Sequence, residues 1–273
     1  MNKKLNIVIL TAPDPKKAAG ILAYDLMKAL NSSGHKTIIV TNSYINYYES
    51  GIYSLTSFSQ SIVTRLFDKI KRIIERESYS NPDFFMHSIN QLQQKLNYKK
   101  ILRIIPNKTD LFIYLFPRSY LNAQDLYLLN QHTKAPIYWY MMDMAPMTGG
   151  CHYAWDCMNY TQECGCCPGL FSNDKNDETN IIWNNKNKYL KNTNIILIAG
   201  SEWQYRQLNQ ASLFKEKRKY KILLPIDNNI FKEGSTYEAR LEMNLPVNKR
   251  ILFFGAVSAN SKRKGFKELA NAL

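Results

Sequence analysis

Short apolar runs alternate along the chain with longer segments in which apolar residues recur at every third or fourth position. Continuous apolar runs are typical of strands buried on both faces of a parallel sheet, and the spaced segments are typical of helices packed against it. The expected strands cover residues 6–11, 37–41, 110–116, 136–140, 194–199 and 220–224. The expected helices cover residues 18–30, 58–76, 82–96, 122–131, 179–190 and 202–210. This alternation predicts the α/β class with a Rossmann-like doubly wound parallel sheet.

A polar, turn-rich segment interrupts the pattern after residue 224. We therefore expect a first domain over residues 1–224 and a linker with a short helix over residues 225–249. Residues 250–273 supply one apolar run, expected as a strand over residues 251–255, and one amphipathic helix. One strand and one helix cannot enclose a core, so this part is predicted to be the first βα unit of a second, incomplete Rossmann-like domain.

The composition is that of a globular protein, because 45% of the 273 residues are hydrophobic and can form a full core. The first apolar run is too short for the core of a signal peptide. Nowhere do about 18 apolar residues follow one another, as a membrane span would require. A cytoplasmic protein is expected.

The net charge of +14 adds a second constraint. A basic excess of this size attracts polyanions, which leaves nucleic acid, anionic membrane surfaces and phosphate-bearing substrates open. A nucleic-acid-binding module is a minor alternative and nucleic acid is not an expected partner, because the chain has no basic helix with interleaved aromatic residues and no known finger spacing. The segment 58–76 has an apolar and a basic face, which fits either a helix docked on anionic lipid or a surface helix packed on the sheet.

All five cysteines fall in a loop expected over residues 143–170. Four of them could act together: Cys151, Cys157, Cys164 and Cys167. Four thiolates can hold Zn²⁺ in a closed, structural site, and Cys166 or His152 could replace one ligand. Only the last two of the four have the tight spacing of a zinc ribbon, so buried free thiols and disulfide or redox chemistry stay open. A catalytic cysteine is not expected, because His152 is the only apparent base nearby.

Several segments together resemble one family, the retaining family-4 glycosyltransferases of the two-Rossmann-domain (GT-B) architecture. The resemblance extends to the bacterial branch that builds exopolysaccharide, capsule and O-antigen chains. The matching segments are DMAPMTGGCHYAWDCMNYTQECGCCPG, DETNIIWNNK, IILIAGSEWQYRQLNQASLF, PIDNNIFKE and FFGAVSANSKRKGF. The resemblance implies that the first domain binds the acceptor and that the second binds most of the nucleotide-sugar donor.

The resemblance also assigns roles to single residues where the motifs match. It places Arg263 and Lys264, ahead of Gly265, on the donor diphosphate, a role that suits a basic loop opening a helix. Gly20 remains from a glycine pair that closes over the diphosphate in relatives. Asp143 follows a strand where relatives carry Leu-His-Asp, and it is expected either to orient an acceptor hydroxyl or to cap the loop.

Three features of the family are missing from the chain. Met142 replaces the histidine before Asp143, and Ala256 replaces an arginine after Gly255. No two glutamates have the Glu-x7-Glu spacing that handles the donor sugar in the family. The chain by itself is therefore expected to lack part of the active site.

The resemblance implies a hexosyltransferase that moves a sugar from a UDP- or GDP-sugar to a hydroxyl of a lipid-linked glycan with retention of configuration. A cytoplasmic protein that docks on the inner face of the plasma membrane would fit this activity. The alternative is a catalytically inactive acceptor-binding or partner subunit. No divalent metal is expected in the chemistry, because basic side chains and helix ends can offset the diphosphate charge; zinc would have a structural role only.

Overall fold

The computed structural model describes residues 3–57, 80–86, 92, 96–117, 120–256, 258–259 and 261–273. The chain divides into two units, Met1–Leu224 and Pro225–Leu273, which we describe separately. Among the described residues, no helix has both the length and the apolar character needed to cross a membrane.

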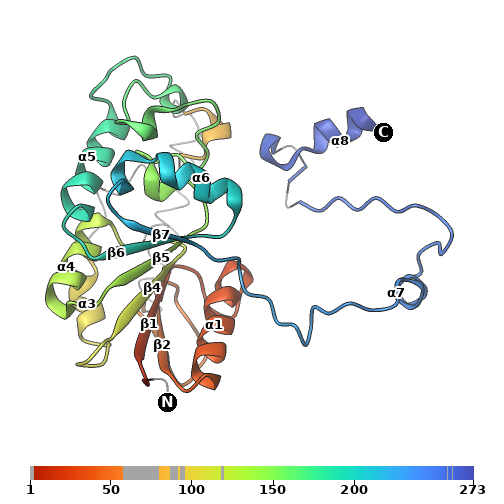
Figure 1. The fold of residues 1–273 in the computed structure, drawn as a ribbon, viewed down its shortest axis with the longest axis horizontal. Coiled ribbons are helices and arrows are strands. Elements are labelled where there is room, and N and C mark those ends of the chain that lie inside the picture. The colour runs from red at the N-terminus through yellow and green to blue at the C-terminus, as the bar shows by residue number, and fades with distance from the viewer. Residues whose placement is uncertain are drawn as a thin grey trace. The chain divides into compact units, whose positions relative to one another are not determined.

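The first unit is built around a sheet of seven parallel strands in the order β3-β2-β1-β4-β5-β6-β7 (Figure 1). Ile9, in the middle of the sheet, pairs with Ile39 on one side and with Ile113 on the other. The strands are β1 (Asn6–Thr11), β2 (Lys36–Thr41), β3 (Ile52–Ser54), β4 (Leu111–Leu115), β5 (Ile137–Met141), β6 (Ile195–Ala199) and β7 (Arg218–Lys221). The predicted α/β class with a Rossmann-like doubly wound parallel sheet is confirmed.

Helices cover both faces of this sheet (Figure 1). Successive residues of a strand point to opposite faces, so Val8 and Leu10 pack in the core cluster that includes residues of α3, α4 and α5, whereas Ile9 packs with residues of α1. The helices are α1 (Ile21–Ser32), α3 (Tyr98–Leu102), α4 (Ala123–Thr133), α5 (Glu178–Leu190) and α6 (Glu202–Gln210). The sheet is buried on both faces, which is why its central strands are continuous apolar runs.

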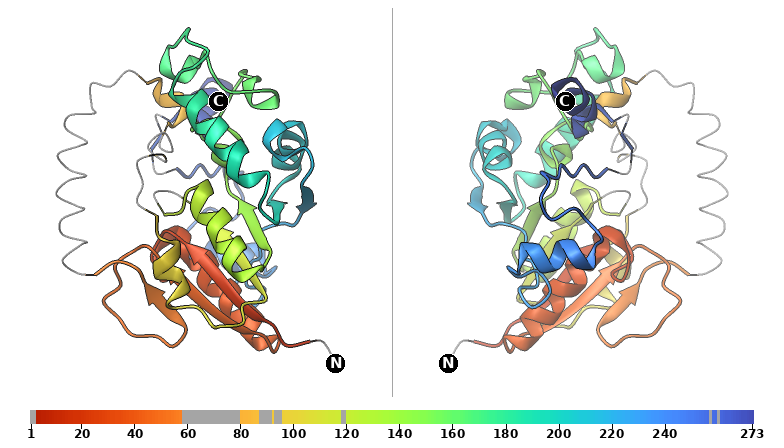
Figure 2. Two further views of the ribbon diagram at one scale, coloured as in Figure 1. Left: turned by 90° about the vertical axis from the view of Figure 1, so that its left-hand side faces the viewer. Right: turned by 90° about the vertical axis from the view of Figure 1, so that its right-hand side faces the viewer.

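The long connection between β5 and α5 lies beyond the carboxyl end of the sheet (Figure 2). It contains three short 3-10 turns, η5 (Ala145–Met147), η6 (Asn159–Thr161) and η7 (Pro168–Leu170). The side chains of Met144, Met147 and Tyr160 are buried in the main core cluster. This segment is therefore packed as part of the core although it has few regular hydrogen bonds of its own.

Two predictions at the edges of the sheet need correction. β7 covers Arg218–Lys221 and not residues 220–224, because it pairs with β6 only as far as Ala199. The apolar side chains of Ile222, Leu223 and Leu224 are exposed. β3 was not among the expected strands, since three residues are too few to give a period-two pattern.

The prediction of a continuous helix over residues 82–96 is also wrong for the first residues of that range. Residues 80–86 form only a 3-10 turn, η3 (Pro82–Phe84), and Phe85 then takes a left-handed backbone conformation (φ 48°) that ends it. The helix expected over residues 58–76, with its basic face, lies outside the described residues.

The second unit contains α7 (Thr236–Glu242), η9 (Lys262–Lys264) and α8 (Phe266–Ala272). The strand expected over residues 251–255 is not formed. Leu252 is 68% exposed and Phe253 is 90% exposed. A strand needs a hydrogen-bonded neighbour, and the described residues of this unit supply none.

Candidate functional site

The sheet has a topological switch point between β1 and β4. The chain places β2 and β3 on one side of β1 and then returns to place β4 to β7 on the other side. Ligands of doubly wound sheets bind outside the carboxyl ends of the strands at such a point. The loops after β1 and β4 meet here, since the Ala12 N–H donates a hydrogen bond to the Phe116 carbonyl oxygen (3.3 Å). The candidate site is therefore the edge formed by the loops after β1, β4 and β5.

Gly20 lies buried at the end of the loop after β1, in the short turn η1 (Ala18–Gly20) that leads into α1. A Cβ atom at this position would lie 1.9 Å from the carbonyl oxygen of Asp14. The Gly20 N–H donates a hydrogen bond to the Lys17 carbonyl oxygen (2.9 Å). Close packing of the loop on itself thus explains why this position is a glycine. A contact between Gly20 and a donor diphosphate stays a prediction.

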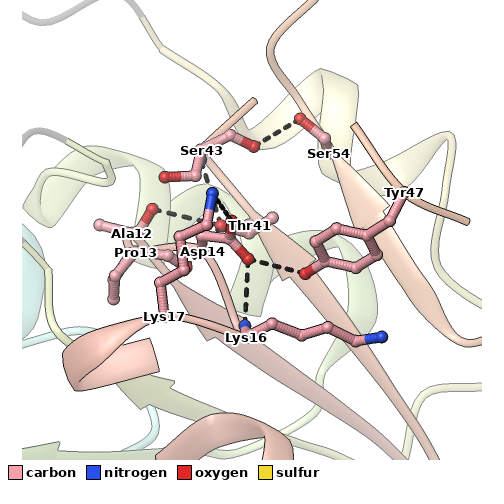
Figure 3. A network of polar contacts seen from close by, with 9 residues as sticks. All are labelled: Ala12, Pro13, Asp14, Lys16, Lys17, Thr41, Ser43, Tyr47 and Ser54. Carbon is pink, nitrogen blue, oxygen red and sulfur yellow. Dashed lines mark hydrogen bonds and ion pairs between the residues drawn. The ribbon is translucent and has the colours of Figure 1, made fainter. Parts of the chain in front are cut away.

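Asp14 is the centre of a polar network in the same loop, which sequence reasoning missed. Its carboxylate accepts hydrogen bonds from the Tyr47 hydroxyl (2.7 Å) and the Lys16 backbone N–H (3.0 Å) and forms an ion pair with Lys17 (3.2 Å) (Figure 3). Burial raises the pKa of the Asp14 carboxyl, but these interactions outweigh burial and hold the pKa below its ordinary value. The Thr41 hydroxyl also donates to the loop backbone (2.8 Å), so the network ties the loop to β2.

The same loop presents two lysine side chains. The Lys16 ammonium forms an ion pair with Glu49 and lies 4.6 Å from the centre of the Tyr47 ring. The Tyr24 hydroxyl donates to the other Glu49 oxygen (2.6 Å). The side chains of Lys16 and Lys17 are 40% and 72% exposed, and each ammonium is paired with a carboxylate, Glu49 for Lys16 and Asp14 for Lys17.

Asp143 lies just after β5 and uses both carboxylate oxygens. One oxygen accepts the Ala145 N–H (2.9 Å), which opens the turn η5, and the other lies 2.8 Å from Nδ1 of His152. The carboxamide of Gln204, on α6, donates to the Asp143 carbonyl oxygen (3.5 Å). The carboxylate therefore caps the loop, as one of the two sequence-based alternatives proposed, and it also positions a histidine.

The pairing with Asp143 fixes the orientation of the His152 ring. When Nδ1 donates its hydrogen to Asp143, Nε2 of the neutral ring is the basic atom. The two side chains are partly buried, at 15% exposed for His152 and 22% for Asp143. The resemblance expected a histidine directly before Asp143, where Met142 stands. The sequence indicated His152 only as a spare metal ligand and as the one apparent base near the cysteines, and not as a partner of Asp143.

The four cysteines proposed as metal ligands line one small cavity in the segment between β5 and α5. They are Cys151, Cys157, Cys164 and Cys167, and the cavity is completed by glycines, Phe84, Asn159 and Thr179. Cys166 is exposed, and all five cysteines are free thiols. Burial raises the pKa of Cys151 and of Cys164 to about 12, so these thiols are neutral near pH 7 as they stand. In the part of the chain that the structure describes, no three ligand-type side chains are set as a metal shell.

Arg263, Lys264 and Gly265 lie in the second unit, whereas the other candidate residues lie in the first. The two basic residues belong to the exposed turn η9, and Gly265 follows with φ 69°, a left-handed conformation that favours glycine. α8 begins directly afterwards. The predicted arrangement of a basic turn leading through a glycine into a helix is present.

Comparison with known proteins gives little beyond this geometry. No protein-family model and no curated protein matches the chain. Among solved structures it is similar to an alpha-glucosyltransferase in complex with UDP and a 13-mer DNA containing a central A:G mismatch, with 11% identity and a TM-score of 0.39 over 83% of this chain and 43% of that one. The chain thus spans less than half the length of that protein. A likeness of this quality assigns no function, and the α/β Rossmann-like fold rests on the chain's own sheet topology.

Proposed function

We propose that the chain acts as a nucleotide-sugar-dependent glycosyltransferase of the GT-B type, with the first unit binding the acceptor and the second contributing to donor binding. The observation that carries the proposal is the Asp143–His152 pair, which lies at the carboxyl end of β5 where the sequence resemblance places the acceptor. The loop after β1 places two exposed lysines, Lys16 and Lys17, at the neighbouring switch point, each paired with a carboxylate.

In the proposed reaction an acceptor hydroxyl bonds to the anomeric carbon of the donor sugar. The bond from that carbon to the diphosphate breaks, and the electron pair leaves with the nucleoside diphosphate, which also takes up the acceptor proton. Asp143 and His152 hold the acceptor hydroxyl in place through hydrogen bonds. Lys264 and Arg263 stabilise the charge that develops on the diphosphate.

The finer assignments follow the sequence resemblance and extend this proposal. They are transfer with retention of configuration, a UDP- or GDP-sugar as donor, and a lipid-linked glycan of a bacterial surface polysaccharide as acceptor. A lipid-linked acceptor would place the protein at the inner face of the plasma membrane, where its net charge of +14 favours anionic lipid.

The test is sugar transfer by the purified chain. Radiolabelled UDP- and GDP-sugars are incubated with lipid-linked glycan acceptors, and label in the lipid fraction is measured for the wild type, for His152→Ala and for the exposed control His132→Ala. We expect transfer by the wild type and the control and a strong loss in His152→Ala. Failure to transfer any sugar, together with failure to bind UDP or GDP, would contradict the proposal.

The second candidate is an acceptor-binding or partner subunit without activity of its own. This candidate predicts that the chain binds lipid-linked glycan and transfers nothing, and that adding the protein's cellular partner restores transfer. The same assay therefore separates the two candidates.

A further inference from the structure

The cysteine cavity is built more tightly than a chance grouping of thiols would need. A Cβ atom at Gly149 would lie 2.2 Å from the Thr179 carbonyl oxygen, so this backbone must approach α5 closely. Gly165 has φ +146°, and a Cβ there would lie 2.2 Å from the Lys175 carbonyl oxygen. Two glycines that line the cavity thus allow separate parts of the segment to close around the sulfur atoms.

A backbone N–H group points at one of the sulfurs. The Gly149 N–H donates to Sγ of Cys164 (3.2 Å). A thiol sulfur is a weak acceptor, whereas a hydrogen bond to an ionised acceptor is roughly twice as strong as one to a neutral acceptor. The bond from Gly149 would therefore be stronger to a metal-bound thiolate at Cys164 than to the neutral thiol.

A buried cation lies beside the same cavity. Lys186, on α5, is 2% exposed, and its ammonium donates to the carbonyl oxygens of Ala145 (2.6 Å) and Thr148 (2.7 Å). None of the ion pairs formed by the described residues includes it. Its electrostatic neighbours are the sulfurs of Cys164 and Cys151 and the carboxylate of Asp143. A buried charge is costly without a counter-charge, and thiolates in the cavity would supply one.

We propose that this cavity binds one zinc ion through four thiolates and that Lys186 balances part of the resulting negative charge. The ligands are Cys151, Cys157, Cys164 and Cys167. Four soft sulfur ligands and a closed, four-coordinate environment are what a structural zinc site requires. A Zn²⁺ ion bound by four thiolates has a net charge of two negative units. The Lys186 ammonium offsets one of them, so that one negative unit remains.

Binding must change the cavity, because the sulfurs line its wall without forming a metal shell in the described residues. The four thiols lose their protons and the sulfurs converge on the ion, so that metal uptake releases protons. Lys186 donates to the backbone between Asp143 and His152, so the bound ion would also fix the loop that holds this pair. Whether this cavity binds zinc does not depend on whether the protein transfers a sugar.

The test is metal content and spectroscopy of the full chain. Zinc is measured by elemental analysis after the chelator-treated protein is dialysed against zinc chloride, and Co²⁺ replaces zinc to report the ligand field. We expect about one metal ion per chain and the absorption bands of tetrahedral Co²⁺ bound by thiolates. The wild-type protein alone gives this result, so the test does not depend on whether a variant folds.

Variants then assign the ligands. Each of the four substitutions C151S, C157S, C164S and C167S should abolish stoichiometric binding, whereas Cys166→Ser, which changes an exposed neighbour in the same segment, should leave it intact. Lys186→Gln should lower zinc affinity about tenfold. The proposal is overturned if the wild-type chain binds neither zinc nor Co²⁺, if it holds iron with acid-labile sulfide, or if Cys166→Ser removes the metal.

Discussion

Nδ1 of His152 lies 2.8 Å from Oδ2 of Asp143 and joins the end of β5 to the cysteine segment. The other oxygen of the same carboxylate caps the turn that follows β5. Asp143 therefore fixes the direction of the chain after the strand and the orientation of the imidazole at the same time. The candidate site at the carboxyl end of the sheet therefore contains an imidazole ring, that of His152, whose position is set both by the end of β5 and by the cysteine segment.

Replacing the histidine tests this relationship. His152→Ala should lower kcat/KM for the acceptor by up to about a hundredfold, because an acceptor hydroxyl would lose its positioning group. The loss should appear in the kinetic constants for the acceptor and not in the free energy of unfolding, a split that a purely structural role would not produce. The exposed control His132→Ala should keep both the rate and the stability. Unchanged kinetics in His152→Ala would remove the pair from the active site.

Gly20 should resist even the smallest substitution. Gly20→Ala places a Cβ atom 1.9 Å from the Asp14 carbonyl oxygen, and the backbone of the loop must move to relieve the contact. We expect the free energy of unfolding to fall by about 2 kcal/mol or more, measured by urea denaturation.

Gly234→Ala is the matched control for this substitution. Nothing lies within 4 Å of a Cβ atom at Gly234, so its effect should stay within about 0.5 kcal/mol. Equal stability of the two variants would show that the loop after β1 is not closed as described.

Asp177 should make the stability of the first unit depend on pH. Its carboxylate caps α5 by accepting the backbone N–H groups of Thr179 (2.9 Å) and Asn180 (3.2 Å), and it accepts the Cys167 N–H (2.8 Å). Burial raises the pKa of this carboxyl, but the hydrogen bonds outweigh burial and the pKa lies below its ordinary 3.8. The folded state thus holds the proton less strongly, and the contribution to stability is present above pH 3.8 and lost as the pH falls through the lower folded pKa.

Asp177→Ala should therefore destabilise the protein by about 1 to 2 kcal/mol at pH 7, the usual range for a lost helix cap. The difference from the wild type should shrink as the pH falls below 3.8. Urea denaturation at several pH values measures it, and the exposed Asp156→Asn serves as the control. A difference that stays constant down to low pH would rule out the ionised cap as its source.

Lys264 should contribute to nucleotide binding if the second unit contacts the donor diphosphate. Lys264→Ala should weaken the affinity for UDP or GDP about tenfold, the equivalent of one charge-assisted hydrogen bond. Calorimetry measures the affinity, and Lys249→Ala, an exposed lysine of the same unit, is the control. Equal losses in both variants would indicate a general charge effect instead of a specific contact.

Much of the fold could be predicted because its signals are local. β1 covers Asn6–Thr11 and α6 covers Glu202–Gln210, as the apolar patterns of these segments indicated. A buried parallel strand and an amphipathic helix each carry their own period, so their existence does not depend on distant residues. The edges were less predictable, since β3 and β7 form only where a neighbouring strand offers hydrogen bonds.

The chemistry of the candidate site was only partly predictable. The sequence indicated the cysteine segment and Asp143, because residue type and spacing carry that information. It did not indicate that Tyr47 reaches Asp14 across 33 positions, or that Lys186 reaches the Thr148 carbonyl oxygen across 38. Neither contact has a spacing that a local pattern could reveal.

By itself, then, the sequence determined the central strands of the parallel sheet, most of the helices that cover it and the grouping of the cysteines, because each follows from a short-range pattern of apolar or chemically distinctive residues. The tertiary structure decided which side chains meet. It brought His152 to Asp143 and Lys186 to the cysteine cavity, because a buried polar group must find its partner wherever the packed core places one.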